Sequence, residues 1–211
     1  MKTKRLVVSA MLIAAATVLS LIQPFALPFG GRITLVSMMP IVILAYMYGT
    51  GWGLFSAFVY ALLQMVTDLK TVSSFFMPGD SQMAIPAAIG VCIFDYILAF
   101  TSLGLGGIFK GKFNNPSKEI CLGAIVATIA RYIMHIISGA IFFGAWAEWF
   151  FSQDNFYKIG EKILSTFSGA GLAFIYSVFY NGLYMIPEII ITAIVTPIVY
   201  KAVSKTNLIK Q

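Results

Sequence analysis

Long apolar stretches dominate the chain, and short polar segments separate them. Because a helix needs roughly 20 apolar residues to cross a bilayer, six stretches are long enough or nearly so: 6–22, 33–48, 52–67, 87–109, 120–146 and 171–200. They are continuously apolar rather than alternating, which disfavours a transmembrane β-barrel. The pattern predicts an all-α integral membrane protein, a single domain over residues 1–211 with six transmembrane helices.

Two parts of this pattern need separate interpretation. The stretches 33–48 and 52–67 are short and only residues 49–51 separate them, so we expect a tight helical hairpin that crosses the bilayer twice. The stretch 6–22 follows three basic residues and in this respect resembles a secretion signal. It is long for the apolar part of a signal, and no clear small-x-small cleavage site precedes Pro24. We expect it to be retained as the first helix.

Composition supports a membrane location, since 59% of the 211 residues are hydrophobic and only 10% are charged. Soluble domains average about 45–50% apolar and about 25% charged residues, and a chain this short cannot bury so large an apolar fraction. This excludes a soluble enzyme, a disordered chain and a secreted disulfide scaffold. It also excludes a nucleic-acid partner, despite the net charge of +6. We expect a multi-pass protein of the cell membrane, in contact with the lipid bilayer.

The distribution of charge predicts the orientation, because cytoplasmic loops are enriched in Lys and Arg. With six crossings and both termini cytoplasmic, the inner side carries one acid, Glu119, against the basic residues Lys2, Lys4, Arg5, Lys110, Lys112, Lys118, Lys201, Lys205 and Lys210. The outer side carries two longer connections. We expect residues 68–86 to form an ordered or lid-like loop, and residues 148–166 to be either an interfacial helix or a solvated connection.

No residue pattern indicates catalysis. Residues 106–112 have the spacing of a phosphate-binding loop, but Phe113 stands where a hydroxyl is needed to reach magnesium. Cys92 and Cys121 lack the spacing of a metal or redox site, and we interpret both as packing residues. One histidine and no clustered carboxylates supply neither a metal site nor an activated nucleophile. We expect no catalytic residue, no metal and no cofactor.

Three charged residues lie inside the apolar stretches: Asp95, Arg131 and Glu188. Each costs at least about 2.5–3.5 kcal/mol in a bilayer and therefore needs a partner or a function. With 1.5 Å of rise per helical residue, Asp95 and Arg131 both lie roughly 12 Å below the outer face. They belong either to a ligand site or to an ion pair that only joins two helices. Glu188 has several open roles: a second site, a helix contact or an approach to the inner interface.

Further polar residues are expected at the same level. His135 and Gly139 continue the helix face of Arg131, since residues four apart are neighbours, and the last predicted helix adds Tyr176 and Asn181. Together they predict a pocket that opens to the outside between the last three helices. A carboxylate, a basic donor, a histidine, an amide and aromatic rings suit a small heteroaromatic molecule. Aromatic faces also attract a cation, for which Asp95 supplies the counter-charge.

Four stretches carry a resemblance to a known family: FGGRITLVSMMPIVILAYMYG at 29–49, DYILAFTSLGLGGIFKG at 95–111, RYIMHIISGAIFFGAWA at 131–147 and YSVFYNGLYMIPE at 176–188. The chain resembles the substrate-binding S components of energy-coupling factor (ECF) vitamin transporters, and within them the thiamine-specific ThiT family. With the matching order of six helices, the resemblance covers nearly the whole chain.

The resemblance implies a thiamine site with these members: Asp95, Tyr96, Arg131, His135, Gly139, Phe143, Tyr176, Asn181 and Tyr60. Phe143 matches a stacking aromatic, and Tyr60 an aromatic at the end of the pocket near the third helix. The chain departs from the family in three places. Asp95 stands where glutamate is commoner, Arg131 stands where lysine is usual, and Gly31 lies near a position where some relatives carry tryptophan.

The resemblance also implies partners: a transmembrane coupling subunit and two cytoplasmic ATPases that hydrolyse ATP in place of this chain. Ala10 and Ala14 form a small-xxx-small surface, which in the family docks the coupling subunit and in any bundle serves close packing. Two other functions stay open. One is an S component for another vitamin or a thiamine precursor. The other is a self-sufficient carrier or membrane-embedded enzyme, which the absence of an internal repeat and of a catalytic cluster disfavours.

Overall fold

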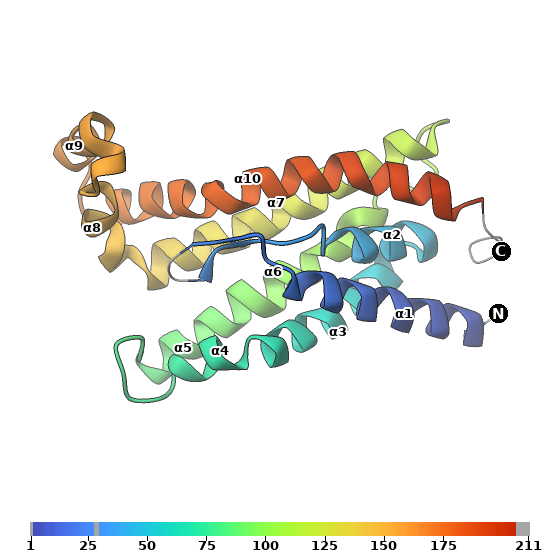
Figure 1. Cartoon of the computed structure of the whole chain (residues 1–211), viewed down its shortest axis with the longest axis horizontal. Coiled ribbons are helices and arrows are strands. Elements are labelled where there is room, and N and C mark those ends of the chain that lie inside the picture. Colours follow the sequence, from blue (N-terminus) through green and yellow to red (C-terminus); the bar gives the residue numbers. More distant parts are fainter. Residues whose placement is uncertain (1, 28–29, 206–211) are drawn as a thin grey trace.

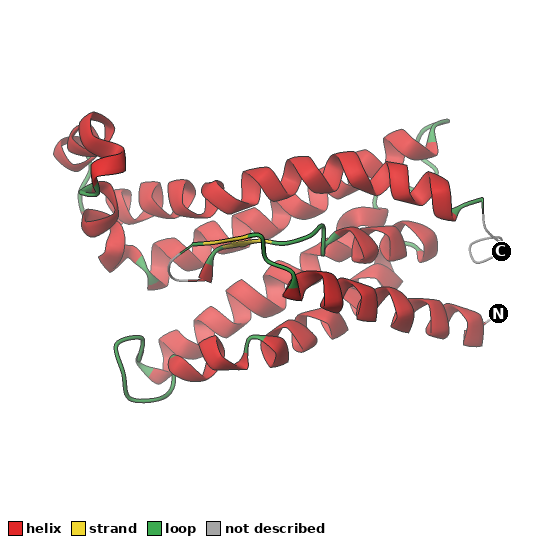
Figure 2. Ribbon diagram, in the orientation of Figure 1, coloured by secondary structure: helices red, strands yellow, loops and turns green. Residues whose placement is uncertain are grey.

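The computed structural model describes residues 2–27 and 30–205, which are mainly helical (Figures 1 and 2). Four long helices are α1 (Lys2–Leu21), α3 (Thr50–Thr67), α7 (Pro116–Phe142) and α10 (Gly169–Val203). A fifth long segment, Ile85–Gly107, combines α5 (Ile85–Val91), a π-helical segment η2 (Cys92–Leu98), α6 (Ala99–Thr101) and a 3-10 segment η3 (Ser102–Gly107). These five segments are long and apolar enough to cross a membrane, which confirms the all-α membrane class.

The sixth predicted crossing is shorter than expected. Helix α2 spans Met39–Tyr48 and not 33–48, with Pro40 in its first turn, where proline is well tolerated. The residues before it form a hairpin in which β1 (Phe25–Ala26) pairs antiparallel with β2 (Arg32–Ile33). Residues 40–47 of α2 are all buried, so this helix is surrounded by protein rather than by lipid. The boundary was predicted wrongly because residues 33–38 are mostly apolar, so composition does not show that the helix begins only at Met39.

The two longer connections are partly helical. Helix α4 (Leu69–Ser74) follows α3 directly, so the first part of the predicted 68–86 loop extends the bundle. The second connection folds into η4 (Gly144–Trp146), α8 (Ala147–Phe151), η5 (Asp154–Phe156) and α9 (Tyr157–Thr166). Helices α8 and α9 project at one end of the molecule (Figure 1). The bulk of 148–166 is therefore helical; its position at a lipid interface stays a prediction.

Helices α7 and α10 lie side by side along most of their length (Figure 1). Glycines also allow α3, η3 and α7 to pack closely against one another. A Cβ atom at Gly104 of η3 would overlap the backbone of Leu54 in α3. A Cβ at Gly123 of α7 would overlap the carbonyl oxygen of Gly106. Because glycine lacks this atom, the backbones of α3, η3 and α7 approach to contact. The bundle that holds the site is assembled through these contacts.

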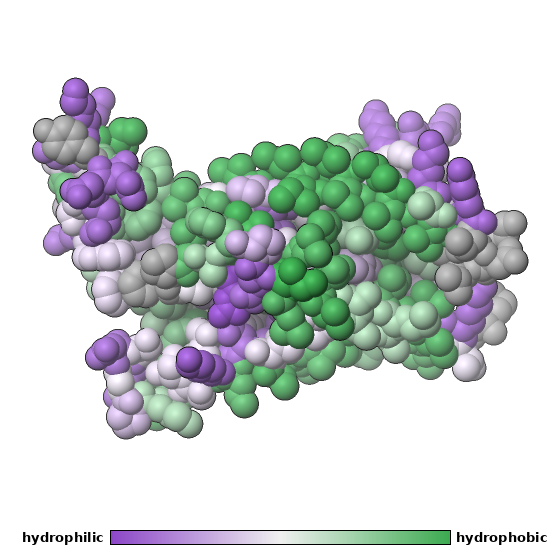
Figure 3. All heavy atoms as spheres, in the orientation of Figure 1, coloured by the Kyte–Doolittle hydropathy of each residue, from purple (hydrophilic) through white to green (hydrophobic). Residues whose placement is uncertain are grey.

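The surface agrees with a bilayer environment. On the face shown in Figure 3, hydrophobic residues dominate the middle of the molecule, apart from one hydrophilic patch, and hydrophilic residues gather at both ends. On α10, Ile186, Ile190, Ile194 and Ile198 form an exposed stripe at four-residue spacing, as expected of a lipid-facing side. Helix α1 begins and α10 ends at the same end of the molecule (Figure 1). Which end faces the cytoplasm stays a prediction, and Lys210 lies outside the described residues.

Candidate ligand-binding site

A cavity of about 150 Å³ lies in the half of the bundle that is nearer to α4 and α8. The β1–β2 hairpin, α3, α5 with η2, α7 and α10 all contribute to its wall. Eight of the nine sequence-predicted binding residues line it: Asp95, Tyr96, Arg131, His135, Gly139, Phe143, Tyr176 and Asn181. The structure therefore brings these eight together on one concave surface, although they come from three segments that are distant in the sequence.

Tyr60 is the ninth, and it lies behind the cavity wall. It is fully buried, its hydroxyl lies 3.4 Å from the carbonyl oxygen of Ala16 in α1, and it is not part of the cavity wall. Its ring packs edge-on against Phe100, which does line the cavity, with ring centroids 5.5 Å apart. Tyr60 therefore supports a wall residue from behind.

Asp95 and Tyr96 are adjacent in sequence, and both line the cavity. They lie in the π-helical segment Cys92–Leu98. A π-helical turn is wider than an α-helical turn and occurs frequently at functional sites. In the sequence this segment is simply a continuation of an apolar helix, so the periodicity of the chain gives no sign of it.

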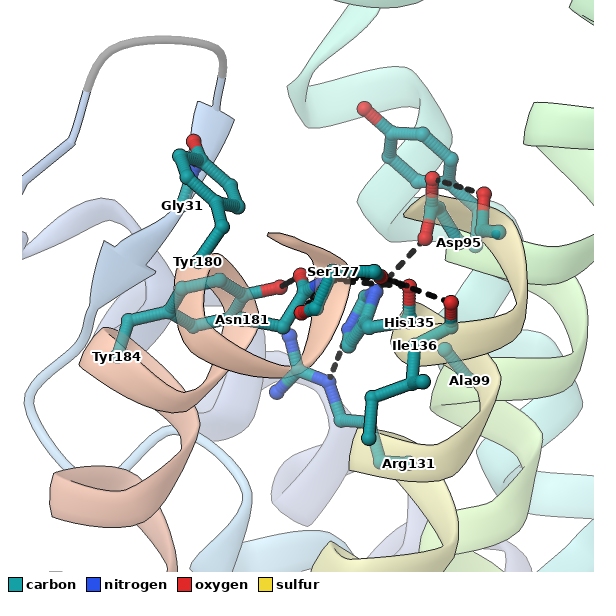
Figure 4. Close-up of polar contacts among 12 residues, drawn as sticks. Gly31, Asp95, Ala99, Arg131, His135, Ile136, Ser177, Tyr180, Asn181 and Tyr184 are labelled. Atoms are coloured by element: carbon teal, nitrogen blue, oxygen red, sulfur yellow. Dashed lines mark hydrogen bonds and ion pairs between the residues drawn. The ribbon is translucent and has the colours of Figure 1, made fainter. Parts of the chain in front are cut away.

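Asp95 is held by two donors from α7 (Figure 4). One carboxylate oxygen lies 2.8 Å from Nδ1 of His135, and the other accepts a hydrogen bond of 2.7 Å from the hydroxyl of Ser138. The Nε of Arg131 donates to Nε2 of His135 at 3.2 Å. Since Arg131 can only donate, Nε2 is the acceptor and Nδ1 carries the proton that faces Asp95. His135 is thus a neutral ring, fixed in one tautomer between a carboxylate and a guanidinium.

Asp95 and Arg131 therefore do not form the direct ion pair that was one interpretation of the sequence. His135 lies between the two groups, and the guanidinium carbon of Arg131 sits 4.2 Å from the ring centroid of Phe100. Both side chains are only half-buried and both face the cavity. Their charges consequently remain available to a bound molecule instead of cancelling in a closed pair.

Helix α10 joins the site through Asn181, whose polar atoms are engaged inside the protein (Figure 4). Its amide nitrogen donates to the backbone oxygens of His135 and Ser177 at 3.2 and 2.9 Å, and its oxygen accepts 2.6 Å from the Tyr184 hydroxyl. Gly139 makes this contact possible, because a Cβ there would overlap the hydroxyl of Ser177. In this arrangement Asn181 and Gly139 hold α7 and α10 together beside the cavity.

Other residues of the cavity were placed elsewhere by sequence reasoning. Asp68, assigned to an outer loop, follows α3 directly and lines the cavity together with Arg32, to which it is joined by an ion pair of 3.0 Å. Thr34, also a wall residue, donates to Glu188 from its backbone nitrogen at 2.5 Å and from its hydroxyl at 2.7 Å. Glu188 thus joins α10 to the non-helical segment between β2 and α2, a contact that none of its three expected roles described. One feature of the sequence could have indicated that Asp68 lies in the cavity wall: it directly follows an apolar helix.

The two residues expected to dock a partner lie away from this cavity. Ala10 and Ala14 are exposed on α1 and line a shallow, mainly apolar groove with Trp52, Phe55 and Val59 of α3. The groove is on the outside of the bundle, so neither alanine packs against another helix in the interior of the bundle. What binds there stays a prediction.

The cavity combines charge of both signs with a wall of aromatic rings. Besides Asp95 and Arg131 it presents the rings of Phe143, Tyr176, Tyr180 and Tyr184. Rings of this kind stack on flat molecules and attract cations. Within the described residues no group of three or more His, Cys, Asp or Glu side chains could hold a metal ion. The fold and the apolar helices therefore define a multi-pass membrane protein with an internal cavity lined by charged and aromatic side chains.

Comparisons with known proteins name the family. The family model described as "Thiamine transporter protein" (Thia_YuaJ) matches residues 6–152, and the chain belongs to this family. It is 27% identical to the thiamine transporter ThiT of Bacillus subtilis (strain 168) over 202 residues, 90% of this chain and 87% of the relative. It is 27% identical over 119 residues to ThiT of Lacticaseibacillus paracasei, which covers 52% of this chain and 54% of that one.

The fold is shared with a solved structure of ThiT from Listeria monocytogenes. The TM-score is 0.67, and the match covers 99% of this chain and 98% of the other at 22% sequence identity. At this identity the match establishes the common fold alone. The specific ligand and the partners of this chain need a separate argument.

Proposed function

We propose that this protein binds thiamine in the cavity around Asp95 and acts as the substrate-binding S component of an ECF transporter in the cell membrane. Family membership supports transport of thiamine. The observation that carries the proposal is the Asp95–His135–Arg131 arrangement inside a wall of aromatic rings. It offers a flat, cationic heteroaromatic molecule both a counter-charge and surfaces for stacking.

The chemistry of thiamine matches these groups. Thiamine joins an aminopyrimidine, which donates and accepts hydrogen bonds, to a positively charged thiazolium ring. Asp95 keeps unused acceptor capacity on both oxygens, since each accepts one hydrogen bond here. The rings of Phe143 and Tyr176 provide faces on which the cation gains cation–π attraction. The site needs only to bind and release its ligand, so no step of bond breaking is assigned to any residue.

In this proposal the cavity opens to the outside and both termini lie in the cytoplasm. Energy comes from two cytoplasmic ATPases through a transmembrane coupling subunit, which docks on the groove that contains Ala10 and Ala14. The exposure of both alanines and the apolar lining of their groove support such a contact between helices. In this proposal the chain itself only recognises and binds the substrate.

Displacement of radiolabelled thiamine from the purified protein tests the proposed ligand. We expect unlabelled thiamine to displace the label at the lowest concentration, and riboflavin and biotin to leave it bound at a thousandfold excess. Tighter binding of the isolated pyrimidine half would instead make the protein a carrier of a precursor. Failure to retain labelled thiamine at all, in a protein that melts cooperatively, would reject the proposed function.

A further inference from the structure

A second carboxylate, that of Asp68, lies in the cavity wall and has no part in the thiamine contacts proposed above. Asp68 follows the C-terminal end of α3, and its side chain is 21% exposed. Its Oδ1 accepts from Nη2 of Arg32 at 3.0 Å and from the hydroxyl of Thr71 at 2.7 Å. Its Oδ2 accepts from the hydroxyl of Tyr96 at 2.8 Å. The three donors come from three separate segments, so Asp68 has a fixed position in the wall.

Tyr96 connects this carboxylate to Asp95. Asp95 and Tyr96 are neighbours in the π-helical segment, and both line the cavity. Because Tyr96 gives its only proton to Asp68, its oxygen can only accept further hydrogen bonds. This end of the cavity therefore presents two carboxylates and an acceptor hydroxyl, a combination that favours a ligand with positive charge and N–H groups.

The charges of the lining balance. Among the described residues that line the cavity, the ionised side chains are Asp68 and Asp95 against Arg32 and Arg131, while His135 is neutral. Removing one member of the Arg32–Asp68 pair changes the net charge of the wall by one unit. Charges act strongly on a ligand inside a protein, because the effective dielectric constant there is well below that of water.

We propose that the Arg32–Asp68 pair sets the charge selectivity of the cavity, with Asp68 favouring a cationic ligand and Arg32 limiting that preference. The inference rests on the proposed function, since it concerns which forms of thiamine the same site accepts. Both residues act on the ligand through charge, and Asp68 also positions Tyr96. Thiamine phosphates, which carry added negative charge, are disfavoured by the same carboxylate.

The test compares thiamine with deazathiamine, a neutral isostere in which a thiophene replaces the thiazolium ring. The dissociation constants of both ligands give a ratio that reports charge preference independently of overall fit. Asp68→Asn should reduce the preference for the cation by about tenfold, and Arg32→Gln should increase it by about tenfold. The double variant Arg32→Gln/Asp68→Asn restores neutrality and should return the ratio close to that of the wild type.

Asp80→Asn is the matched control, because Asp80 is an exposed carboxylate in the same connection and outside the cavity wall. It should leave the ratio unchanged. If either single variant weakens both ligands equally, the pair is only a structural link and the inference is wrong. If Asp68→Asn does not fold, Arg32→Gln alone decides through the direction of its change. Wild-type protein that binds neither ligand would overturn the proposed function as well, whereas wild-type binding with unchanged ratios overturns the inference alone.

Discussion

His135 shows how single residues shape the site. Its ring separates the carboxylate of Asp95 from the guanidinium of Arg131, so both charges stay directed at the cavity. Sequence spacing placed His135 on the face of Arg131 correctly, because residues four apart in a helix are always neighbours. It could not show that the histidine would lie between the two charges, because side-chain rotamers and the contact between two helices decide that.

Replacing His135 with phenylalanine tests this role. His135→Phe keeps a ring of similar size but leaves Nε of Arg131 and one oxygen of Asp95 without a partner, each a loss of about 1–3 kcal/mol if not replaced by water. We expect thiamine affinity to fall at least tenfold in a calorimetric titration.

Tyr132→Phe is the control for His135→Phe. It removes the 2.7 Å bond from Tyr132 to the Val178 carbonyl, also between α7 and α10 but outside the cavity wall. It should lower the melting temperature without changing affinity, and an equal loss in both variants would contradict the role.

At the scale of elements, the long helices were predicted well and the special ones were not. Continuous apolar runs located α1, α3, α7 and α10 to within a few residues. The hairpin before α2 was missed because each strand has only two residues, too few for an alternating pattern to appear in the sequence. The π-helical segment was missed because its residues continue the apolar run of the helix before it, so the sequence marks no change of helix type. Eight of nine predicted site residues line the cavity, and Asp68 was left out because loops and helix ends look alike in a sequence.

The contact between α7 and α10 depends on the absence of a side chain at position 139. Gly139→Ala places a methyl group against the Ser177 hydroxyl, which forces the helices apart at a cost of about 1–3 kcal/mol. We expect a lower melting temperature and weaker ligand binding, because Asn181 loses its position. Gly171→Ala in α10 meets only a side-chain atom of Phe167 at 3.8 Å, an ordinary contact. Helix propensity should make that control neutral or slightly stabilising. Equal thermal stability of the two variants would contradict the close contact.

The whole molecule has its cavity in one half and the start of α1 and the end of α10 at the opposite end. Basic residues gather around that end, which the positive-inside rule assigns to the cytoplasm. The five long helices and the buried α2 together allow six crossings, consistent with both ends on one side. We therefore expect the cavity in the other half to face the outside, as the proposed capture of thiamine requires.

Labelling of single cysteines in intact cells checks this orientation. In a background with Cys92 and Cys121 replaced by alanine, Asp80→Cys in the connection after α4 should react with a membrane-impermeant maleimide. Lys112→Cys, between η3 and α7, should react only after the cells are opened. Both positions are exposed, so access to the reagent depends on the side of the membrane. The reverse labelling pattern would invert the molecule and rule out capture from outside.

Calorimetric titration of the wild type and of Asp95→Asn with thiamine shows whether the carboxylate of Asp95 binds the ligand. The asparagine keeps the shape of the side chain but removes the charge, and melting curves of both ligand-free proteins report any loss of folding. We expect a single high-affinity site in the wild type and a loss of affinity of at least tenfold in the variant, about 1.4 kcal/mol or more. Unchanged affinity combined with a lowered melting temperature would contradict this expectation and leave Asp95 with the task of joining two helices.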